Sequence, residues 1–272
     1  MASSLFVIIP GFGGPNIEHK CEILESNLRI IRTYKWIKKV IIKICIYDKT
    51  VFTIIPDELL NDPDIIWIYK QGIVGEFLLT EACPFIDISE TTDYVLILLD
   101  DIELQSNINF NKMIEYIETF NFDIVSPVLT SDSKYQFNYM LQMPNHNNII
   151  SVTTACELFC YFMKYESYMY KYYPAIEKFN PWMWGLDMML YKYFNLNIGL
   201  INAMTMKHHY KNYAYSPINQ QSQQSPQSLQ SLQSSQTLPD PLVGQKQLFD
   251  KYQTNMEELS QQKAIRYIIN EL

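Results

Sequence analysis

The chain has 272 residues and a mass of 32.1 kDa, with 48% hydrophobic and 18% charged residues. These values are typical of a globular protein and exclude a wholly disordered chain, a collagen-like repeat and a coiled-coil rod. The formal net charge is -8 and the sequence has no Lys/Arg run, so nucleic acid is excluded as the expected partner.

No stretch reaches the roughly 18 consecutive apolar residues that a membrane-spanning helix requires. The first residues lack a basic segment and meet Pro10 and three glycines early, which differs from a signal peptide. Five cysteines without a Cys-x-x-Cys pair suggest neither a disulfide framework nor a zinc knuckle. We therefore expect a chain without a transmembrane segment that works in the cytoplasm.

The first half of the chain alternates between two hydrophobic patterns. Apolar runs rich in β-branched residues predict buried strands at 5–10, 40–47, 64–69, 93–99 and 123–128. Helical spacing follows at 16–36, 74–82 and 110–120. This alternation predicts a mixed, mostly parallel α/β sheet with helices on both faces, whose ligands bind at the carboxyl ends of the strands.

The second half is less regular. Strand-like and helix-like pieces are mixed at 149–162, and an aromatic stretch follows at 165–184. Residues 216–241 are almost all Gln, Ser, Pro and Leu, which predicts a linker or mobile loop. Helical spacing resumes over 245–272, in a helix that packs on the core or on a partner. We expect three parts: an α/β domain at 1–213, the Gln/Ser-rich segment at 214–243 and an amphipathic helix at 244–272.

The acid pair Asp100-Asp101 comes directly after the predicted strand at 93–99. Carboxylates at the end of a buried strand point into the crevice at the edge of the sheet, where they can hold a hard divalent cation against a diphosphate. An ordinary acidic loop is the alternative.

A second candidate is the segment that contains Trp182, Trp184, Gly185 and Asp187. Sugars present flat C–H faces to aromatic rings, and a carboxylate can accept the proton of an attacking hydroxyl. The alternative is an aromatic core segment in which Asp187 stands at the start of a helix.

His208 and His209 form the third candidate. An imidazole can complete the coordination of a cation such as Mn²⁺ that carboxylates have begun. Adjacent residues of a strand point to opposite faces, so only one of the two should reach a shared metal. Two surface histidines are the alternative reading.

Three glycines, Gly11, Gly13 and Gly14, follow the first predicted strand and favour a sharp turn or the close approach of a ligand. Position 16 is Asn, so the dinucleotide fingerprint Gly-x-Gly-x-x-Gly is not met. Asp48 ends the second strand and could bind a ribose. Residues at strand ends are the candidates for nucleotide binding: Pro10, Gly11, Asp48, Gln71, Gly72 and Asp100.

Taken in order, the strand ending in Pro10-Gly11, the acid pair, Trp184-Gly185-Leu186-Asp187 and a late histidine resemble GT-A glycosyltransferases. The Trp-Gly-Leu-Asp segment followed by His208 is similar to the DUF707-type domains of plants and bacteria. The resemblance covers roughly residues 5 to 213. The Asp-x-Asp motif of that fold falls on Leu99-Asp100-Asp101, so its first carboxylate, which often contacts the donor ribose, is missing here.

The resemblance implies a GT-A, Rossmann-like fold and a metal-dependent glycosyltransferase. Mn²⁺ or Mg²⁺ would be held by Asp101 and His208, with Asp100 in support and Asp187 as the base of an inverting reaction. The donor would be a nucleotide sugar, with UDP as the expected nucleotide, and the acceptor a glycan or glycoprotein held by Trp182 and Trp184. A homo-oligomer formed through the C-terminal helix is a further expectation.

Two other classes of function stay open at this point. A Rossmann-type methyltransferase or oxidoreductase would use the Gly11 loop and Asp48 without a metal. A carbohydrate-binding protein without catalytic activity would keep the aromatic wall and tolerate the loss of Asp101.

Overall fold

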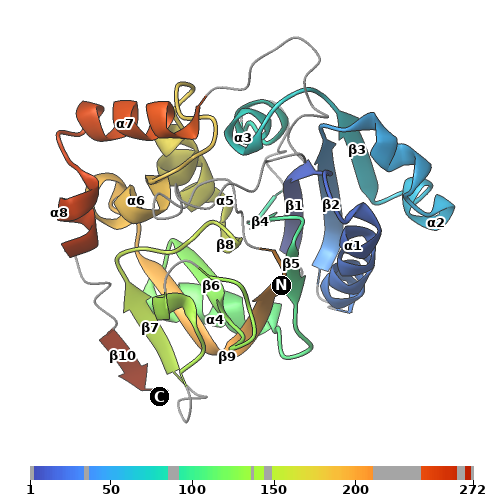
Figure 1. Cartoon of the computed structure of the whole chain (residues 1–272). Helices are drawn as coiled ribbons and strands as arrows, with labels where there is room; N and C mark the ends of the chain where they lie inside the picture. Colours follow the sequence, from blue (N-terminus) through green and yellow to red (C-terminus); the bar gives the residue numbers. More distant parts are fainter. Residues whose placement is uncertain are drawn as a thin grey trace.

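The computed structural model describes residues 3–33, 37–84, 92–135, 138–143, 149–210, 240–261 and 267–270. A ten-stranded mixed sheet runs through the molecule in the order β10-β7-β9-β6-β8-β4-β1-β2-β3, and β5 pairs with β9 beside this path. Helices pack around the sheet (Figure 1). The structure confirms the predicted mixed, mostly parallel α/β architecture.

The strands are β1 Ser3–Phe12, β2 Ile37–Ile46, β3 Ile65–Tyr69, β4 Tyr94–Leu98, β5 Ile102–Leu104, β6 Ile124–Leu129, β7 Ile149–Thr153, β8 Cys160–Lys164, β9 Ile198–His208 and β10 Tyr267–Asn270. The α-helices are α1 Ile17–Arg32, α2 Asp57–Leu60, α3 Val74–Glu81, α4 Phe110–Phe120, α5 Tyr165–Ser167, α6 Leu186–Phe194, α7 Pro241–Lys251 and α8 Met256–Gln261. Short 3₁₀ or π turns are η1 Lys49–Thr53, η2 Asn138–Met140, η3 Tyr168–Tyr172 and η4 Tyr173–Ala175.

The strands β1 to β4 form the parallel half of the sheet. β1 pairs with β2 and β4, and β2 pairs with β3, all in parallel. Every residue of β4 is buried, which is typical of a strand that is covered on both faces. Because these strands are parallel, the segments that follow them meet at one edge of the sheet, here called the carboxyl edge.

Antiparallel strands bring later segments to the same edge. β8 runs antiparallel to β4, so its first residue, Cys160, lies opposite Leu98, the last residue of β4. β5 pairs antiparallel with the end of β9 and sets Ile102 beside His208. The end of β9 therefore reaches the acids that follow β4.

The five predicted strands correspond to β1, β2, β3, β4 and β6, and the helix predicted at 110–120 is α4. The helix predicted at 16–36 is α1, which ends at Arg32 with Thr33 as its C-cap. The mixed segment at 149–162 divides into β7 and the start of β8.

The single helix expected over 245–272 is wrong. This segment forms α7, α8 and the strand β10, which pairs antiparallel with β7. α7 stops because Gln253 takes a left-handed φ of 52°, and Asn255 then starts α8 by accepting the Glu258 N–H over 2.8 Å. The helical spacing of apolar residues does not show where α7 ends.

Among the described residues, no helix is long and apolar enough to cross a membrane. All five cysteines have free thiols. The part of the Gln/Ser-rich segment at 216–239 lies outside the described residues, and the boundaries at 213 and 243 stay predictions.

Candidate active site

A buried ion pair ties the loop after β1 to the loop after β4. Lys20 Nζ lies 2.7 Å from Asp100 Oδ2 and 2.6 Å from the Gly13 carbonyl oxygen, and donates to both. The Gly13 N–H also donates to Asp100 Oδ2, over 3.1 Å. Gly14 has a φ of 75°, and a Cβ there would stand 2.5 Å from the Tyr47 hydroxyl, so this turn requires glycine.

Asp101 and His208 meet at the carboxyl edge from different strands. Asp101 Oδ2 lies 3.0 Å from His208 Nε2, and the two residues are 8% and 7% exposed. His208 Nδ1 donates to the Lys134 carbonyl oxygen over 2.6 Å. The Phe159 ring packs against the imidazole with centroids 4.6 Å apart. These contacts fix the imidazole with Nε2 toward Asp101, the arrangement that a metal-binding histidine needs.

The surroundings shift the proton affinities of this centre. Burial raises the pKa of Asp100 to about 6, against the lowering effect of Lys20. Burial lowers the pKa of His208, but the hydrogen bond and charge of Asp101 outweigh it and leave the pKa above its ordinary value. Asp101 therefore favours the positively charged form of the His208 imidazole.

One oxygen at this centre lacks a partner. Asp101 Oδ1 is buried and accepts no hydrogen bond, which is costly for a carboxylate. A divalent cation would satisfy this oxygen, with His208 Nε2 as a nitrogen ligand. Within the described part of the chain no three His, Cys, Asp or Glu residues are grouped to hold a metal. Asp101 and His208 would thus supply two ligands to a cation, and its other ligands would have to come from a bound diphosphate or from water.

The other predicted nucleotide-binding residues follow neighbouring strands of the parallel half. The Asp48 carboxylate accepts the Thr50 N–H over 2.9 Å and starts the turn η1. Gln71 Nε2 donates to the Tyr47 carbonyl oxygen over 3.3 Å, which joins the loops after β2 and β3. Pro10 and Gly11 lie at the end of β1, and Gly72 lies between β3 and α3.

Tyr47 connects these loops to the acid pair. Burial, followed by the charges of Asp100, Asp48 and Asp101, raises the pKa of the Tyr47 hydroxyl. All three carboxylates are therefore within electrostatic range of one phenol. Asp48 follows β2, and Asp100 and Asp101 follow β4, so the three residues stand after strands of the parallel half at the carboxyl edge.

Asp187 lies in the first turn of α6, where Gly185 is the N-cap. Gly185 has a φ of 78°, and a Cβ there would stand 2.8 Å from the Phe249 ring of α7. Burial raises the pKa of Asp187 to about 6, although backbone N–H groups of Met188 and of Asp187 itself lower it. The Asp187 carboxylate therefore has a higher affinity for a proton than an ordinary aspartate, a property that suits a general base.

The charges of Asp187 and Glu157 both act on the buried phenol of Tyr139. Burial, and after it the charge of Asp187, raises the pKa of the Tyr139 hydroxyl, to which Glu157 also contributes. The charge of Glu157 also acts on His208. Glu157 precedes β8, and its charge acts both on His208 and on Tyr139, the phenol on which Asp187 also acts.

Trp182 and Trp184, the predicted acceptor-binding residues, are partly exposed and precede α6. The Trp184 carbonyl oxygen accepts a hydrogen bond from Asn180 Nδ2 over 3.0 Å. The Pro181 carbonyl oxygen accepts the Gly75 N–H of α3 over 2.7 Å. This turn is therefore held between α3 and α7, and the acceptor role of the two rings stays a prediction.

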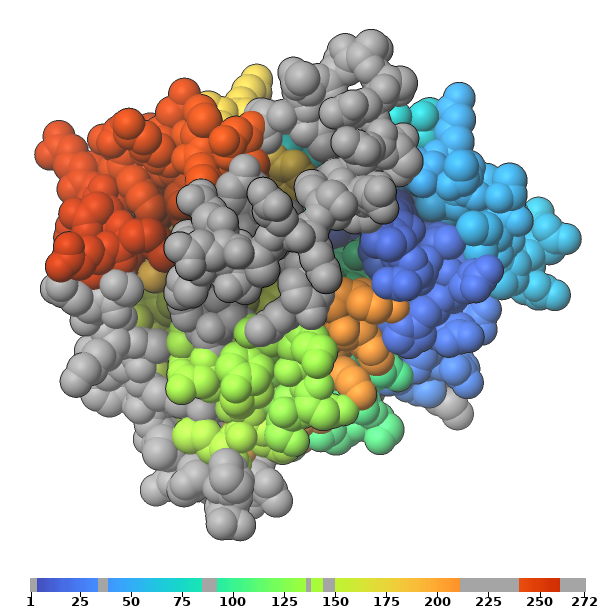
Figure 2. Space-filling model, viewed as in Figure 1, coloured from blue at the N-terminus to red at the C-terminus, as the bar shows by residue number. Residues whose placement is uncertain are grey.

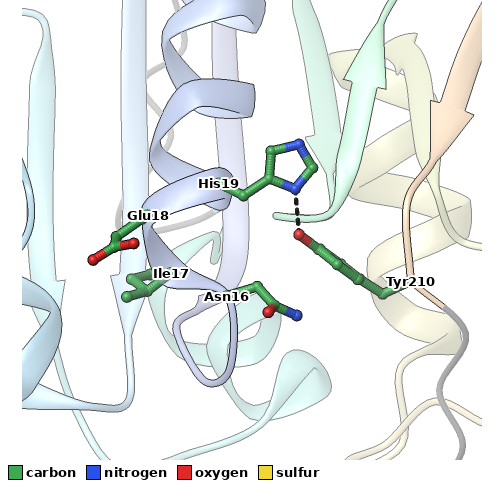
Figure 3. A pocket seen from close by; sticks show the side chains of 5 residues that line it. All are labelled: Asn16, Ile17, Glu18, His19 and Tyr210. Carbon is green, nitrogen blue, oxygen red and sulfur yellow. Dashed lines mark hydrogen bonds between the residues drawn. The ribbon is translucent and has the colours of Figure 1, made fainter.

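An open pocket of about 500 Å³ lies between the start of α1 and the end of β9. Figure 2 shows the two segments against one another, with α1 in dark blue and the end of β9 in orange. His19 and Tyr210 hydrogen-bond through the imidazole Nδ1 and the phenol (Figure 3). The pocket is lined by Asn16, Ile17, Glu18, His19 and Tyr210.

His209 takes a different direction from His208. Its Nε2 lies 2.8 Å from Glu103 Oε2, and its ring meets the His19 ring edge-on with centroids 4.7 Å apart. Of the two adjacent histidines, His208 is the one whose ring contacts the Asp101 carboxylate.

The sequence interpretation missed Lys20, Tyr47, His19 and Tyr210. Lys20 had a detectable signal, because it lies on the same helix face as the apolar residues Leu24 and Ile31 and is buried with them. A lysine on the apolar face of a helix needs a buried partner. The partner, Asp100, is 80 residues away and could not be identified from the sequence.

No protein-family model matches the sequence, and no curated protein sequence matches it. The likeness to DUF707-type domains therefore stays a prediction.

Several solved structures resemble the chain in fold. GalNAc-T7, crystallised with UDP, GalNAc and Mn²⁺, aligns with a TM-score of 0.50 at 11% identity, over 96% of this chain and 57% of that one. Residues 1–349 of TarS from S. aureus, in complex with UDP-GlcNAc, align with a TM-score of 0.48 at 12% identity, over 76% of this chain and 59% of that one. A 4-diphosphocytidyl-2C-methyl-D-erythritol synthase from Anaerococcus prevotii DSM 20548 aligns with a TM-score of 0.46 at 17% identity, over 74% and 89%.

The chain has the GT-A fold of nucleotide-diphospho-sugar transferases. It spans little more than half the length of GalNAc-T7 and of the TarS fragment.

Proposed function

We propose that the protein is a cation-dependent glycosyltransferase that moves a sugar from a UDP-sugar to a hydroxyl acceptor. One observation carries this proposal: the buried, unpartnered Oδ1 of Asp101 beside His208 at the carboxyl edge of a GT-A sheet. In folds of this kind that edge is where ligands bind. The solved GalNAc-T7 complex with UDP and Mn²⁺ supports the choice of nucleotide and metal.

The donor would lie across the ends of β1, β2, β3 and β4. Asp101 and His208 would hold Mn²⁺ or Mg²⁺, and the ion would supply the positive charge that stabilises the departing diphosphate. The Gly13 loop, fixed by Lys20 and Asp100, allows close approach of the donor. The nucleotide-binding residues of this proposal are Pro10, Gly11, Asp48, Gln71, Gly72 and Asp100.

Asp187 would act as the general base. Its carboxylate accepts the proton of the acceptor hydroxyl while that oxygen attacks the anomeric carbon from the side opposite the diphosphate. The C–O bond to the diphosphate breaks as the new glycosidic bond forms, and the configuration inverts. Trp182 and Trp184 would hold a glycan or glycoprotein acceptor by stacking against sugar C–H faces. A cytoplasmic location and a homo-oligomer through the C-terminal segment belong to the same proposal.

The proposal is tested by incubating the full chain with UDP-sugars and Mn²⁺ and measuring the release of UDP, with and without sugar acceptors. We expect release that depends on the cation and stops in the presence of a chelator. The anomeric configuration of the product, read by NMR, decides between inversion and retention. Absence of both transfer and donor hydrolysis with every nucleotide sugar would contradict the proposal and favour a carbohydrate-binding protein.

A further inference from the structure

The adjacent carboxylates Asp100 and Asp101 follow the same strand but have different partners. Asp100 Oδ2 accepts hydrogen bonds from Lys20 Nζ and from the Gly13 N–H. Asp101 Oδ2 faces His208 Nε2, and Asp101 Oδ1 has no hydrogen-bond partner. Asp100 is thus paired with the Lys20 ammonium, whereas Asp101 keeps a buried oxygen without a hydrogen-bond partner.

The pair of Lys20 and Asp100 is nearly closed to solvent. Their side chains are 10% and 12% exposed, and their charged atoms are 2.7 Å apart. Lys20 Nζ also donates to the Gly13 carbonyl oxygen over 2.6 Å. A buried ammonium that lost its carboxylate would remain without compensation, so this ion pair resists opening.

We propose that Lys20 is a positioning residue that decides which of the two adjacent acids binds the cation. By engaging Asp100 at the Gly13 loop, Lys20 leaves the cation to Asp101 and His208. This inference rests on the proposed function, because it concerns the same cation. It assigns a role to a lysine of α1 whose ammonium is directed at Asp100 and the Gly13 carbonyl oxygen rather than at the cation ligands themselves.

The charge of Lys20 also limits the strength of cation binding. With Lys20 present, one positive charge opposes the two adjacent carboxylates. Without it, both carboxylates face the cation site and Asp100 becomes a competing ligand. Removal of this lysine should therefore strengthen cation binding, whereas the loss of a lysine that only supports the fold would weaken it or leave it unchanged.

The test is a titration of Mn²⁺ alone into the full chain, followed by the electron paramagnetic resonance signal of free Mn²⁺. Lys20→Met should bind Mn²⁺ about tenfold more tightly than the natural chain. Asp100→Asn leaves the lysine charge without its partner beside the site, and should bind Mn²⁺ about tenfold more weakly. The double variant should return to within about threefold of the natural affinity, because both ends of the pair are then removed.

Lys43→Met is the matched control. Lys43 is 8% exposed, as Lys20 is, and its Nζ likewise donates to a carbonyl oxygen, that of Glu81, and lies near a carboxylate, 3.8 Å from Glu81 Oε2. It lies in β2, and we expect its replacement to leave the Mn²⁺ affinity unchanged. Circular dichroism of every variant checks folding. If Lys20→Met does not fold, the Asp100→Asn and double variants still decide the question.

Equal or weaker Mn²⁺ binding by Lys20→Met would overturn the role of Lys20. Loss of Mn²⁺ binding in the double variant would identify Asp100 as a direct ligand, which would also overturn the role of Lys20. Asp101→Asn separates this inference from the proposed function. If that variant binds Mn²⁺ as the natural chain does, or if the natural chain binds none, the cation centre itself is wrong and the inference is wrong with it.

Discussion

The loop after β4 and the first turn of α6 both present carboxylates, but the two regions treat them differently. Asp100 and Asp101 each face a positive or protonatable partner, Lys20 and His208. The Asp187 carboxylate accepts hydrogen bonds from backbone N–H groups, and its charge raises the pKa of the buried Tyr139 hydroxyl. The surroundings of Asp100 and Asp101 suit the binding of a cation and a charged donor. The surroundings of Asp187 suit the acceptance of a proton. Substitutions in each region should therefore affect different steps, ligand binding in the first and proton transfer in the second.

The largest effect is expected for Asp187→Asn. Asparagine preserves the shape of the side chain but accepts no proton, so turnover should fall by about 10² to 10⁴. Affinity for UDP and Mn²⁺ should stay near that of the natural chain, because those ligands belong to the other region. Steady-state kinetics and calorimetry measure the two quantities.

Asp240→Asn is the matched control for that variant. Asp240 caps α7 by accepting the Leu242 N–H over 2.9 Å, so it too is a carboxylate at the start of a helix. We expect it to keep its turnover. Near-natural turnover of Asp187→Asn would contradict the base assignment and favour a retaining mechanism.

Gly185→Ala tests whether the turn before Asp187 is rigidly built. An alanine would have to adopt the φ of 78° and would meet the Phe249 ring at 2.8 Å. We expect the free energy of unfolding to fall by about 1 to 3 kcal/mol, from backbone strain and crowding together. Urea unfolding measures the change.

A second substitution separates the two causes. Phe249→Leu in the Gly185→Ala background should recover the part of the loss that is due to crowding. Unchanged stability of Gly185→Ala alone would show that the turn is not held as described.

The pH dependence of turnover should also report on Asp187. Its pKa is raised to about 6, so the base form is lost below that pH and turnover should fall about tenfold per pH unit there. In the folded state the proton is held more tightly than in the unfolded chain. Ionisation of Asp187 therefore lowers stability as the pH rises from about 4 to about 6, and Asp187→Asn should reduce that slope to the part due to Asp100, whose pKa is also raised to about 6.

The pH dependence of turnover and that of stability are measured for the natural chain and for Asp187→Asn. The kinetics use saturating donor and Mn²⁺. If the turnover of Asp187→Asn still falls below about pH 6, the pH dependence is due to another group.

The smallest effect is expected for the Gln/Ser-rich segment, which joins the end of β9 to α7. Its composition supplies no core, so replacement of residues 216–239 by a Gly/Ser sequence of equal length should change stability by no more than about 0.5 kcal/mol. Thermal melting measures this. A fall of more than about 10 °C would show that the segment packs on the domain. Unchanged melting with lower turnover would identify an active-site lid.

The parallel half of the fold could be predicted because its strands are continuous apolar runs. Val95, Leu96 and Ile97 are buried on both faces of β4, and this pattern can be read directly from the sequence. The C-terminal segment could not be predicted in the same way. Its helical spacing continues past Gln253, where a single left-handed residue ends the helix.

The candidate site divides in the same manner. Asp101 and His208 could be proposed because each stands at the end of an apolar run, and the structure brings them together through the pairing of β5 with the end of β9. The ion pair of Lys20 with Asp100 depends on how α1 packs against the sheet, which no local pattern encodes. The candidate residues at strand ends could thus be named from the sequence, and their chemical roles stay predictions, whereas partners contributed by a helix face required the structure.

Calorimetric titration of UDP is the most direct test of the central claim, which is that Asp101 and His208 hold a cation for a nucleotide diphosphate. With Mn²⁺ present, the natural chain and the control Glu103→Gln, whose side chain pairs with His209, should bind UDP equally. Removal of Mn²⁺ by a chelator, or the substitution Asp101→Asn, should weaken binding by about 10²-fold, or about 2.7 kcal/mol. Equal UDP affinities with and without chelator in the natural chain would contradict the account.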